Sequence, residues 1–516
     1  MRKLPPITTF VIISLILSIT ISYGLISSSH YNIYNTQNSK EFTIRLNKAF
    51  PNWMKQYKVP GAAIALIEDG KITWKKGYGY ANKQTGQSIT ADTIFRIASV
   101  SKPIAAWGVM HLVDEGIIKL DDPAEKYLTR WHIPTSKFNS NGVTIRRLLS
   151  HTSGLNVEAS PGYSPSKPLP SIEQSLLGIA GKQWTVKLIN KPGTTFKYSG
   201  GGFSVLQLII EEVTGRKFTD YMQSEIYKPL KMTETRYDRK FSEKTIIATA
   251  YTGAGKALED RPWIEQASGG VYTSLNDLSK FTAACMNDSN GDKMGRGVIK
   301  PSTLKEMFTP QKNTKSIFGV YGLGFIPEKL KNGETLISHS GDITGWNAEM
   351  AFLPKEKSGI VILVNSDAGY YFKSDVLGVW TNWLTKSSNN ETGFLRNMQK
   401  VLLTTAIFIM MLFTYFIYSI IKQFRNRKRI YLLVFDRKER VKGWVKCILP
   451  ALLAIIWYVV FYTDILFKYL FGLEDYLLFT FFSPEFFWLT FIVVLFGITE
   501  TIVSLLSIKV AGGNRR

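Results

Sequence analysis

The 516-residue sequence contains only two cysteines and five histidines. Cys285 and Cys447 lie far apart in segments of different composition, which excludes a disulfide framework, a CxxC redox motif and a cysteine-based zinc site. The histidines show neither HxxH nor HExxH spacing, so a metal-dependent hydrolase is not expected. We predict no metal and no other cofactor.

Positive charge, in contrast, is in large excess, and its position along the chain indicates what kind of partner it serves. The formal net charge is +23, and ten Lys and Arg residues fall between Lys422 and Lys446, against only Asp436 and Glu439 as anions. Because this stretch lies between two long apolar runs, we interpret it as a determinant of membrane topology with some attraction to anionic lipid. No nucleic-acid partner is predicted.

Three apolar runs in the last quarter of the chain predict transmembrane helices. The first, 401–421, has no charged residue in 21 positions, which matches the thickness of a bilayer at 1.5 Å per residue. The second, 447–466, contains one acidic residue, Asp464, near its far end. The third is placed at 486–508, with Glu500 inside it. The C-terminal part is therefore predicted to be an α-helical membrane domain.

The positive-inside rule orients these spans. The basic loop 422–446 is expected in the cytoplasm, which puts everything before residue 400 outside. Residues 1–28 agree, since Arg2 and Lys3 precede an apolar run and small residues follow it, as in a secretion signal. Whether this segment is cleaved or remains as an N-terminal anchor stays open. The prediction is a multi-pass protein of the cell membrane with an extracytoplasmic domain.

That domain is expected at 39–384. An apolar run at 62–67, a turn at Asp69-Gly70 and an alternating run at 71–80 predict a β-hairpin. A helix-rich middle follows from Ser99 to about Leu230, and strand patterns return between residues 335 and 365. This order predicts an α+β fold in which an antiparallel sheet is flanked by helices and carries a helical insertion.

Ser99 and Lys102 are the candidate nucleophile and base. They follow the apolar stretch 94–98 and open a buried helix at 104–112, where three residues of spacing bring the amine beside the hydroxyl. Burial lowers the pKa of a lysine, so that its amine can accept the serine proton. The same SxxK spacing also occurs at Ser164, Ser302 and Ser419, none of which has a strand before it and a buried helix after it.

Seven motifs, one of which contains this pair, follow one another in a recognisable order. They are Val59-Pro60-Gly61, Phe95-Arg96-Ile97-Ala98-Ser99-Val100-Ser101-Lys102, Leu120-Asp121-Asp122-Pro123, Leu148-Leu149-Ser150-His151-Thr152-Ser153-Gly154-Leu155, Tyr198-Ser199-Gly200-Gly201-Gly202-Phe203 after Lys191-Pro192-Gly193, Ser268-Gly269-Gly270-Val271-Tyr272, and His339-Ser340-Gly341. In this order the sequence resembles the serine β-lactamase and penicillin-binding protein superfamily, in its class C β-lactamase-like (peptidase S12-type) branch. The resemblance covers nearly the whole of 39–384.

The resemblance implies roles for the matching residues. Ser99 would attack a carbonyl and form an acyl-enzyme, while Lys102 and Tyr198 would move the protons. The strand carrying His339, Ser340 and Gly341 would line the substrate site. The oxyanion hole would combine the backbone N–H of Ser99 with that of Asp342, just after Gly341.

Two departures from the family pattern bear on the substrate. The usual Tyr-x-Asn ends in Gly200 here, so the amide that commonly holds the substrate's acyl-amide is missing. The usual Lys-Thr-Gly begins with His339, a group mostly neutral at pH 7, which either serves the substrate or only hydrogen-bonds within its strand. Both departures argue against an efficient penicillinase. His151 and Cys285 are interpreted as structural.

The leading hypothesis is a membrane-anchored extracytoplasmic serine hydrolase. It would act through an acyl-enzyme on amide or ester bonds of a small-molecule or peptide substrate of the cell envelope that contains D-amino acids, as penicillin-binding DD-peptidases do. Related alternatives are a peptidase that removes an acyl-D-amino-acid cap from a prodrug, a D-alanyl esterase and a β-lactamase. A different class, a catalytically silent cell-wall sensor, would need a cytoplasmic effector domain, for which 422–446 is too short.

Overall fold

The computed structural model describes residues 6–28, 38–157, 162–316, 319–426, 429–431 and 484–509, together with the single positions 33, 36, 452 and 456. Two compact units are present. One comprises Asn32–Gly393, and the other comprises Met1–Tyr31 with Phe394–Arg516. The first contains the predicted domain 39–384.

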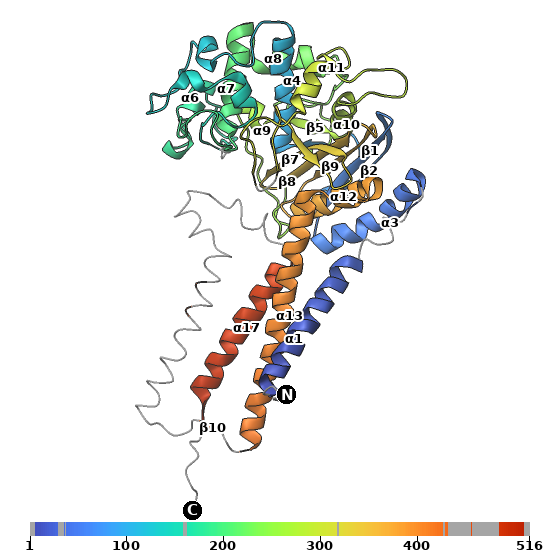
Figure 1. The fold of residues 1–516 in the computed structure, drawn as a ribbon, viewed down its shortest axis with the longest axis vertical. Coiled ribbons are helices and arrows are strands. Elements are labelled where there is room, and N and C mark those ends of the chain that lie inside the picture. Colours follow the sequence, from blue (N-terminus) through green and yellow to red (C-terminus); the bar gives the residue numbers. More distant parts are fainter. Residues whose placement is uncertain are drawn as a thin grey trace, which may run out of the picture. The chain divides into compact units, whose positions relative to one another are not determined.

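An antiparallel sheet of seven strands forms the centre of the unit Asn32–Gly393, in the order β3-β2-β1-β9-β8-β7-β6 (Figure 1). Its strands are β1 (Gly61–Glu68), β2 (Lys71–Asn82), β3 (Gln87–Ser88), β6 (Ile326–Lys329), β7 (Thr335–Ile343), β8 (Trp346–Leu353) and β9 (Ser358–Val364). A separate pair is formed by β4 (Ile94–Arg96) and β5 (Tyr272–Ser274). The N-terminal strands thus pair with the C-terminal ones, which confirms the predicted fold class.

The predicted hairpin is present because its turn chemistry suits it. Asp69 and Gly70 both have positive φ, 52° and 72°, as the two central residues of a type I′ turn require. β1 on one side of this turn is buried almost throughout, and the first half of β2 on the other side alternates between exposed and half-buried positions. β1 also pairs with β9, from Ala62 opposite Val364 to Ile67 opposite Gly359. It therefore lies inside the sheet, as its apolar sequence predicts.

Helices cover the sheet and fill the long insertion. The helices of this unit are α3 (Ser39–Tyr57), α4 (Ser101–Asp114), α5 (Ile145–Leu149), α6 (Ile172–Leu176), α7 (Gly200–Thr214), α8 (Phe218–Met222), α9 (Gln266–Gly269), α10 (Leu275–Ala284), α11 (Pro301–Met307) and α12 (Gly369–Thr385). Stacked rings join α3 to α12, since Phe42 and Trp383 lie 4.2 Å apart. α4 is buried around almost its whole circumference, which is typical of a helix in the centre of a domain.

The other unit contains the apolar helices α1 (Pro6–Ser28), α13 (Asn390–Arg425) and α17 (Pro484–Leu506), with the short strands β10 (Arg429–Tyr431) and β11 (Ser507–Lys509). Among the described residues, α13 alone is both long and apolar enough to cross a bilayer, and it contains the predicted span 401–421. α17 covers most of the predicted span 486–508. The predicted span 447–466, apart from positions 452 and 456, and most of the basic loop 422–446 lie outside the described residues.

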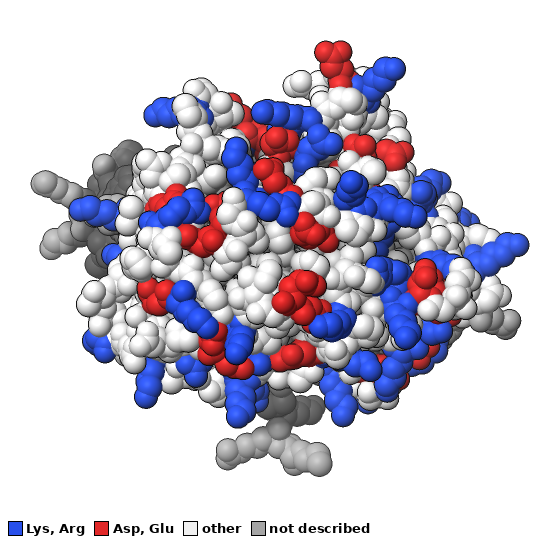
Figure 2. Space-filling model, turned by 90° about the horizontal axis from the view of Figure 1, so that it is seen from above, with Lys and Arg blue, Asp and Glu red and all other residues white. Residues whose placement is uncertain are grey.

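Charges on the face shown in Figure 2 are mixed. Lys and Arg side chains alternate there with Asp and Glu side chains, and no broad area carries a single sign. A nucleic-acid site is typically a clustered basic patch. The lack of a nucleic-acid partner stays a prediction.

Candidate active site

Ser99 lies in a tight turn between the short strand β4 and helix α4. A 3₁₀ turn at Ala98–Val100 runs directly into α4, so Ser99 stands just before the α-helix rather than inside its first turn. Ala98 has a φ of 45°, an uncommon conformation for a residue with a side chain. The Ser101 hydroxyl accepts a hydrogen bond from the Val271 N–H at 3.1 Å and fixes the start of the helix. Ser99 is left partly exposed.

Lys102 is the first partner of Ser99. Its Nζ lies 3.1 Å from the Ser99 Oγ and donates a second hydrogen bond, of 2.7 Å, to the Ser268 carbonyl oxygen. The side chain is 1% exposed. Burial lowers the pKa of Lys102 to about 7, because the charged amine loses its hydration. A large fraction of the amine is therefore neutral at pH 7 and able to accept the Ser99 proton.

Tyr198 closes over the same lysine. The Lys102 Nζ lies 4.7 Å from the centre of the Tyr198 ring and 5.7 Å from that of Phe203. Tyr198 is half-buried and stands at the end of the segment that leads into α7. Ser99, Lys102 and Tyr198, which are separated by up to 99 positions in the sequence, are thus brought together. Their catalytic roles stay predictions.

Gly341 places strand β7 against the serine turn. A Cβ on Gly341 would lie 2.1 Å from the Ile97 carbonyl oxygen and 3.0 Å from the Val100 nitrogen, so no other residue fits. β6 pairs with β7 only as far as Ser338, and among the described strands none continues the pairing along 339–343 on that side. This free edge beside Ser99 is where a carbonyl oxygen of a substrate can meet backbone N–H groups. The N–H of Asp342 remains the predicted second donor.

His339 is buried and neutral. Its Nδ1 lies 2.7 Å from the Ser340 carbonyl oxygen and must donate to it, so Nε2, at 2.8 Å, accepts from the Tyr321 hydroxyl. Burial lowers the pKa of His339 to about 3, and the nearby Lys102 acts in the same direction. The site therefore has no cation where the family pattern has a lysine. Tyr321 was not found from the sequence.

Ser340 and Asp342 point their side chains to the opposite face of β7, because side chains alternate along a strand. There the Ser340 hydroxyl donates to Asp342 at 3.1 Å, and both residues contact the Lys373 amine of α12. Neither side chain reaches the Ser99 face. What these two residues can offer a substrate is their backbone.

His151 has the structural surroundings predicted for it. The ring is fully buried, and Nδ1 accepts a hydrogen bond of 3.0 Å from the Ser199 N–H. It lies 4.2 Å from the Tyr198 ring, centre to centre, and supports that ring from behind. Burial holds the pKa of His151 well below its usual value. Cys285 is likewise buried, with its thiol near the Phe281 carbonyl oxygen.

In the part of the chain that the structure describes, no group of three or more His, Cys, Asp or Glu side chains is arranged to hold a metal ion.

A helix-flanked antiparallel sheet, with a serine and a buried lysine three residues apart beside strand β7, defines the class of serine hydrolases built like β-lactamases and penicillin-binding proteins. The family model described as Beta-lactamase matches residues 46–375. The chain belongs to this family.

Known proteins extend the comparison. The chain is 26% identical over 434 residues to Protein flp of Staphylococcus aureus (strain N315), covering 80% of this chain and 81% of that protein. It is 27% identical to the Putative penicillin-binding protein PbpX of Bacillus subtilis (strain 168), over 62% of this chain and 74% of the relative.

Among solved structures, the octameric penicillin-binding protein homologue from Pyrococcus abyssi has a TM-score of 0.55 at 28% identity, covering 69% of this chain and 81% of that one. The crystal structure of SurE has a TM-score of 0.56 at 22% identity, over 67% of this chain and 77% of that one, and shows the fold alone.

Proposed function

We propose that the protein is a membrane-anchored extracytoplasmic serine hydrolase that cleaves amide or ester bonds in D-amino-acid-containing material of the cell envelope. The observation that carries the proposal is the contact of 3.1 Å between the Ser99 hydroxyl and a buried lysine whose pKa is lowered to about 7. Such a pair can activate a serine without a histidine. A silent sensor would have no need of it.

The reaction follows from these positions. As the Ser99 Oγ bonds to the substrate carbonyl carbon, its proton passes to Lys102, and the negative oxygen that forms is stabilised by N–H groups at the β7 edge. The proton then goes to the leaving amine or alcohol, by way of Tyr198, as the old bond breaks. A water molecule resolves the ester on Ser99 in the same manner, which restores the serine hydroxyl and releases the acid.

The neutral state of His339 shapes which substrates are expected. A permanent cation at this position would pair with the carboxylate of a penicillin or of a terminal peptide residue. His339 is held neutral by burial and by Tyr321, and so provides no such partner. This favours substrates that carry no carboxylate beside the scissile bond, such as internal amides and D-alanyl esters, over β-lactams.

Contacts within the apolar unit support membrane anchoring through α1 as well as α13. Ser18 and Ser22 of α1 are fully buried, and the Ser22 hydroxyl lies 2.6 Å from that of Thr404. Phe10 stacks on Tyr415 at 4.7 Å. Small and hydroxyl-bearing residues of this kind let helices pack closely in lipid. The contacts favour an uncleaved anchor, and the mass of the purified chain tests this, since cleavage near residue 24 would remove the N-terminal helix.

The test of the hydrolase is intact-mass analysis of the full chain in detergent after mixing with a penicillin and, separately, with a D-alanyl ester. We expect an adduct with the ester that is absent in Ser99→Ala, and little or none with the penicillin. A lasting penicillin adduct would instead identify a penicillin-binding peptidase, and one that turns over a β-lactamase. A chain that forms no Ser99-dependent adduct with any acyl donor would contradict the proposal.

A further inference from the structure

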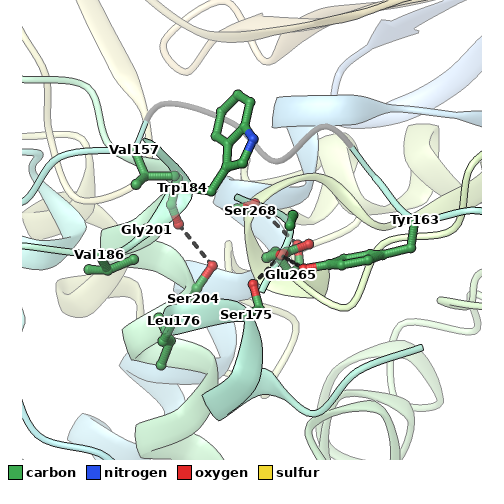
Figure 3. Close-up of a pocket in the computed structure, with 12 residues that line it drawn as sticks. Val157, Tyr163, Ser175, Leu176, Trp184, Val186, Gly201, Ser204, Glu265 and Ser268 are labelled. Carbon is green, nitrogen blue, oxygen red and sulfur yellow. Dashed lines mark hydrogen bonds between the residues drawn. The ribbon is translucent and has the colours of Figure 1, made fainter. Parts of the chain in front are cut away.

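A small pocket lies behind the segment that carries Tyr198, and Figure 3 shows the side chains around it. It is lined by Val157, Tyr163, Ser175, Leu176, Ala180, Trp184, Val186, Gly200, Gly201, Ser204, Glu265 and Ser268. Ser268 joins it to the candidate active site, because its carbonyl oxygen accepts the 2.7 Å hydrogen bond from Lys102. The cavity measures about 10 Å³, which is room for a group the size of one water molecule.

Glu265 is the charged group of this pocket. One carboxylate oxygen, Oε1, accepts hydrogen bonds from the Tyr163 hydroxyl at 2.9 Å and from the Ser175 hydroxyl. The other, Oε2, is buried and has no hydrogen-bond partner among the described residues, while the whole residue is only 6% exposed. A buried carboxylate oxygen without a donor is costly. A ligand that donates a hydrogen bond there is therefore favoured.

Hydrogen bonds from a neighbouring helix hold the backbone on both sides of Glu265. Gln207 of α7 donates from Nε2 to the Ile264 carbonyl oxygen at 2.9 Å and accepts from the Ala267 N–H at 3.1 Å, so the chain on both sides of Glu265 is held. The remaining walls are mostly apolar, and Val157, Leu176, Trp184 and Val186 are among them (Figure 3). The lining contains no Lys, Arg or His. The pocket thus suits a cation and opposes an anion.

Gly200 forms part of the pocket wall. It lines the pocket without a side chain, at the position where the family pattern has asparagine. Its neighbour Gly201 has no room for a side chain, because a Cβ there would lie 2.9 Å from Val186 and 3.0 Å from the Asn156 carbonyl oxygen. Where the family pattern has an amide, this wall is therefore bare backbone beside a pocket that contains a carboxylate.

We propose that this pocket binds a primary ammonium group on the acyl part of the substrate, with Glu265 Oε2 as its acceptor. The ammonium fills a space of one water molecule and donates to the oxygen that has no partner among the described residues. The inference rests on the proposed hydrolase function and narrows it to substrates whose acyl residue has a free amine.

The experiment compares four esters of one alcohol with the full chain in detergent. D-alanyl and 4-aminobutyryl esters carry an α- or an ω-ammonium, whereas propionyl and N-acetyl-D-alanyl esters carry none. We expect kcat/KM to be higher for one of the ammonium esters, and the preference over propionyl to fall about 10- to 150-fold in Glu265→Gln, as for a hydrogen bond to a charged group. Which ammonium ester is preferred shows where on the acyl chain the amine lies.

Two further variants make the result decisive. Glu328→Gln changes another buried glutamate, on β6 and away from the pocket. It should leave the ratio of kcat/KM for the preferred ammonium ester to kcat/KM for the propionyl ester as in the wild type. Gly200→Asn should place a side chain at the pocket wall and lower the preference for the ammonium ester, although Glu265 is unchanged. An equal loss on both kinds of ester in Glu265→Gln, or an unchanged ratio, overturns the pocket assignment. If no ester is turned over in a Ser99-dependent way, the proposed function itself fails.

Discussion

A fully buried lysine lies on each side of strand β7, Lys102 of α4 on one and Lys373 of α12 on the other. Their pKa values are shifted in opposite directions. On the Ser99 face, the partners of Lys102 among the described residues are a hydroxyl, a carbonyl oxygen and aromatic rings, and burial lowers its pKa to about 7. On the far face, burial acts on Lys373 too, but the carboxylates of Asp342, Glu349 and Glu391 outweigh it and raise the pKa of its amine. Carboxylates, not burial, thus decide whether a buried lysine is a base or a permanent cation.

The largest expected effect comes from removing the lysine that lacks carboxylates. Lys102→Met should slow acylation of Ser99 by about 10²- to 10⁴-fold, the usual contribution of a general base. Lys102→Arg should not restore it, because a guanidinium does not give up its proton. The rate of adduct formation by mass spectrometry measures both. Acylation within tenfold of the wild-type rate in Lys102→Met would contradict this role.

Removing the other lysine should affect stability rather than chemistry. Lys373→Met leaves the carboxylates of Asp342 and Glu349, 3.0 and 3.5 Å away, without their cation. Breaking such a buried group costs about 3–5 kcal/mol of unfolding free energy. Chemical denaturation of the full chain measures it, with the exposed Lys355→Met as the control, for which we expect a change within about 0.5 kcal/mol. Equal stabilities of the two variants would refute the assignment.

The two lysines should also differ in their response to pH. Lys102 acts as a base only when it is neutral, so kcat/KM for an uncharged ester should rise tenfold per pH unit below about pH 7 and level off above it. Because the pKa of Lys373 is raised, its amine stays protonated over this pH range and causes no second change in kcat/KM with pH. A pH profile of the wild type and of Lys102→Met tests this, since the limb should vanish in the variant. A profile that is flat from pH 5 to 8 would exclude Lys102 as the base.

The smallest expected effect comes from adding a second cation on the side of β7 where Ser99 and Lys102 lie. His339→Lys would put a cation near Lys102, and like charges disfavour each other. The acidic limb of the pH profile should therefore move to lower pH, while penicillin acylation gains a partner for its carboxylate. Comparison of the limb in His339→Lys and in His339→Gln, which adds no charge, measures the effect. A limb at the same pH in both would mean that the two positions do not interact.

The approach of Ser99, Lys102 and Tyr198 could be predicted from the sequence, whereas the partners of the other buried charged residues could not. Ser99 and Lys102 are neighbours on one turn, and the motif around Tyr198 is local, so their approach follows from short-range patterns. Glu265 and Lys373 carry no such signal. Their burial arises from partners 24 to 102 positions away, such as Ser175, Tyr163 and Glu349. Tyr321, which holds His339 neutral, was missed for the same reason.

The membrane part could be predicted as apolar runs but not as an assembly. Length and hydropathy place a helix at 401–421, and α13 contains it. Which residues of α1 and α17 contact α13, such as Ser22 or Phe496, depends on side-chain packing that hydropathy does not describe.

The pairing of β1 with β9 has a consequence for how the protein folds during its synthesis. A chain made from its N-terminus exposes β1 early, yet Ala62 finds its partner Val364 only after about 300 further residues have been added. β7, which supports the serine turn through Gly341, also belongs to this late part. Ser99 and Lys102 are therefore synthesised long before the strand that completes their surroundings. The candidate site is complete only after the C-terminal strands have paired with the N-terminal ones, which makes its assembly a late step of folding.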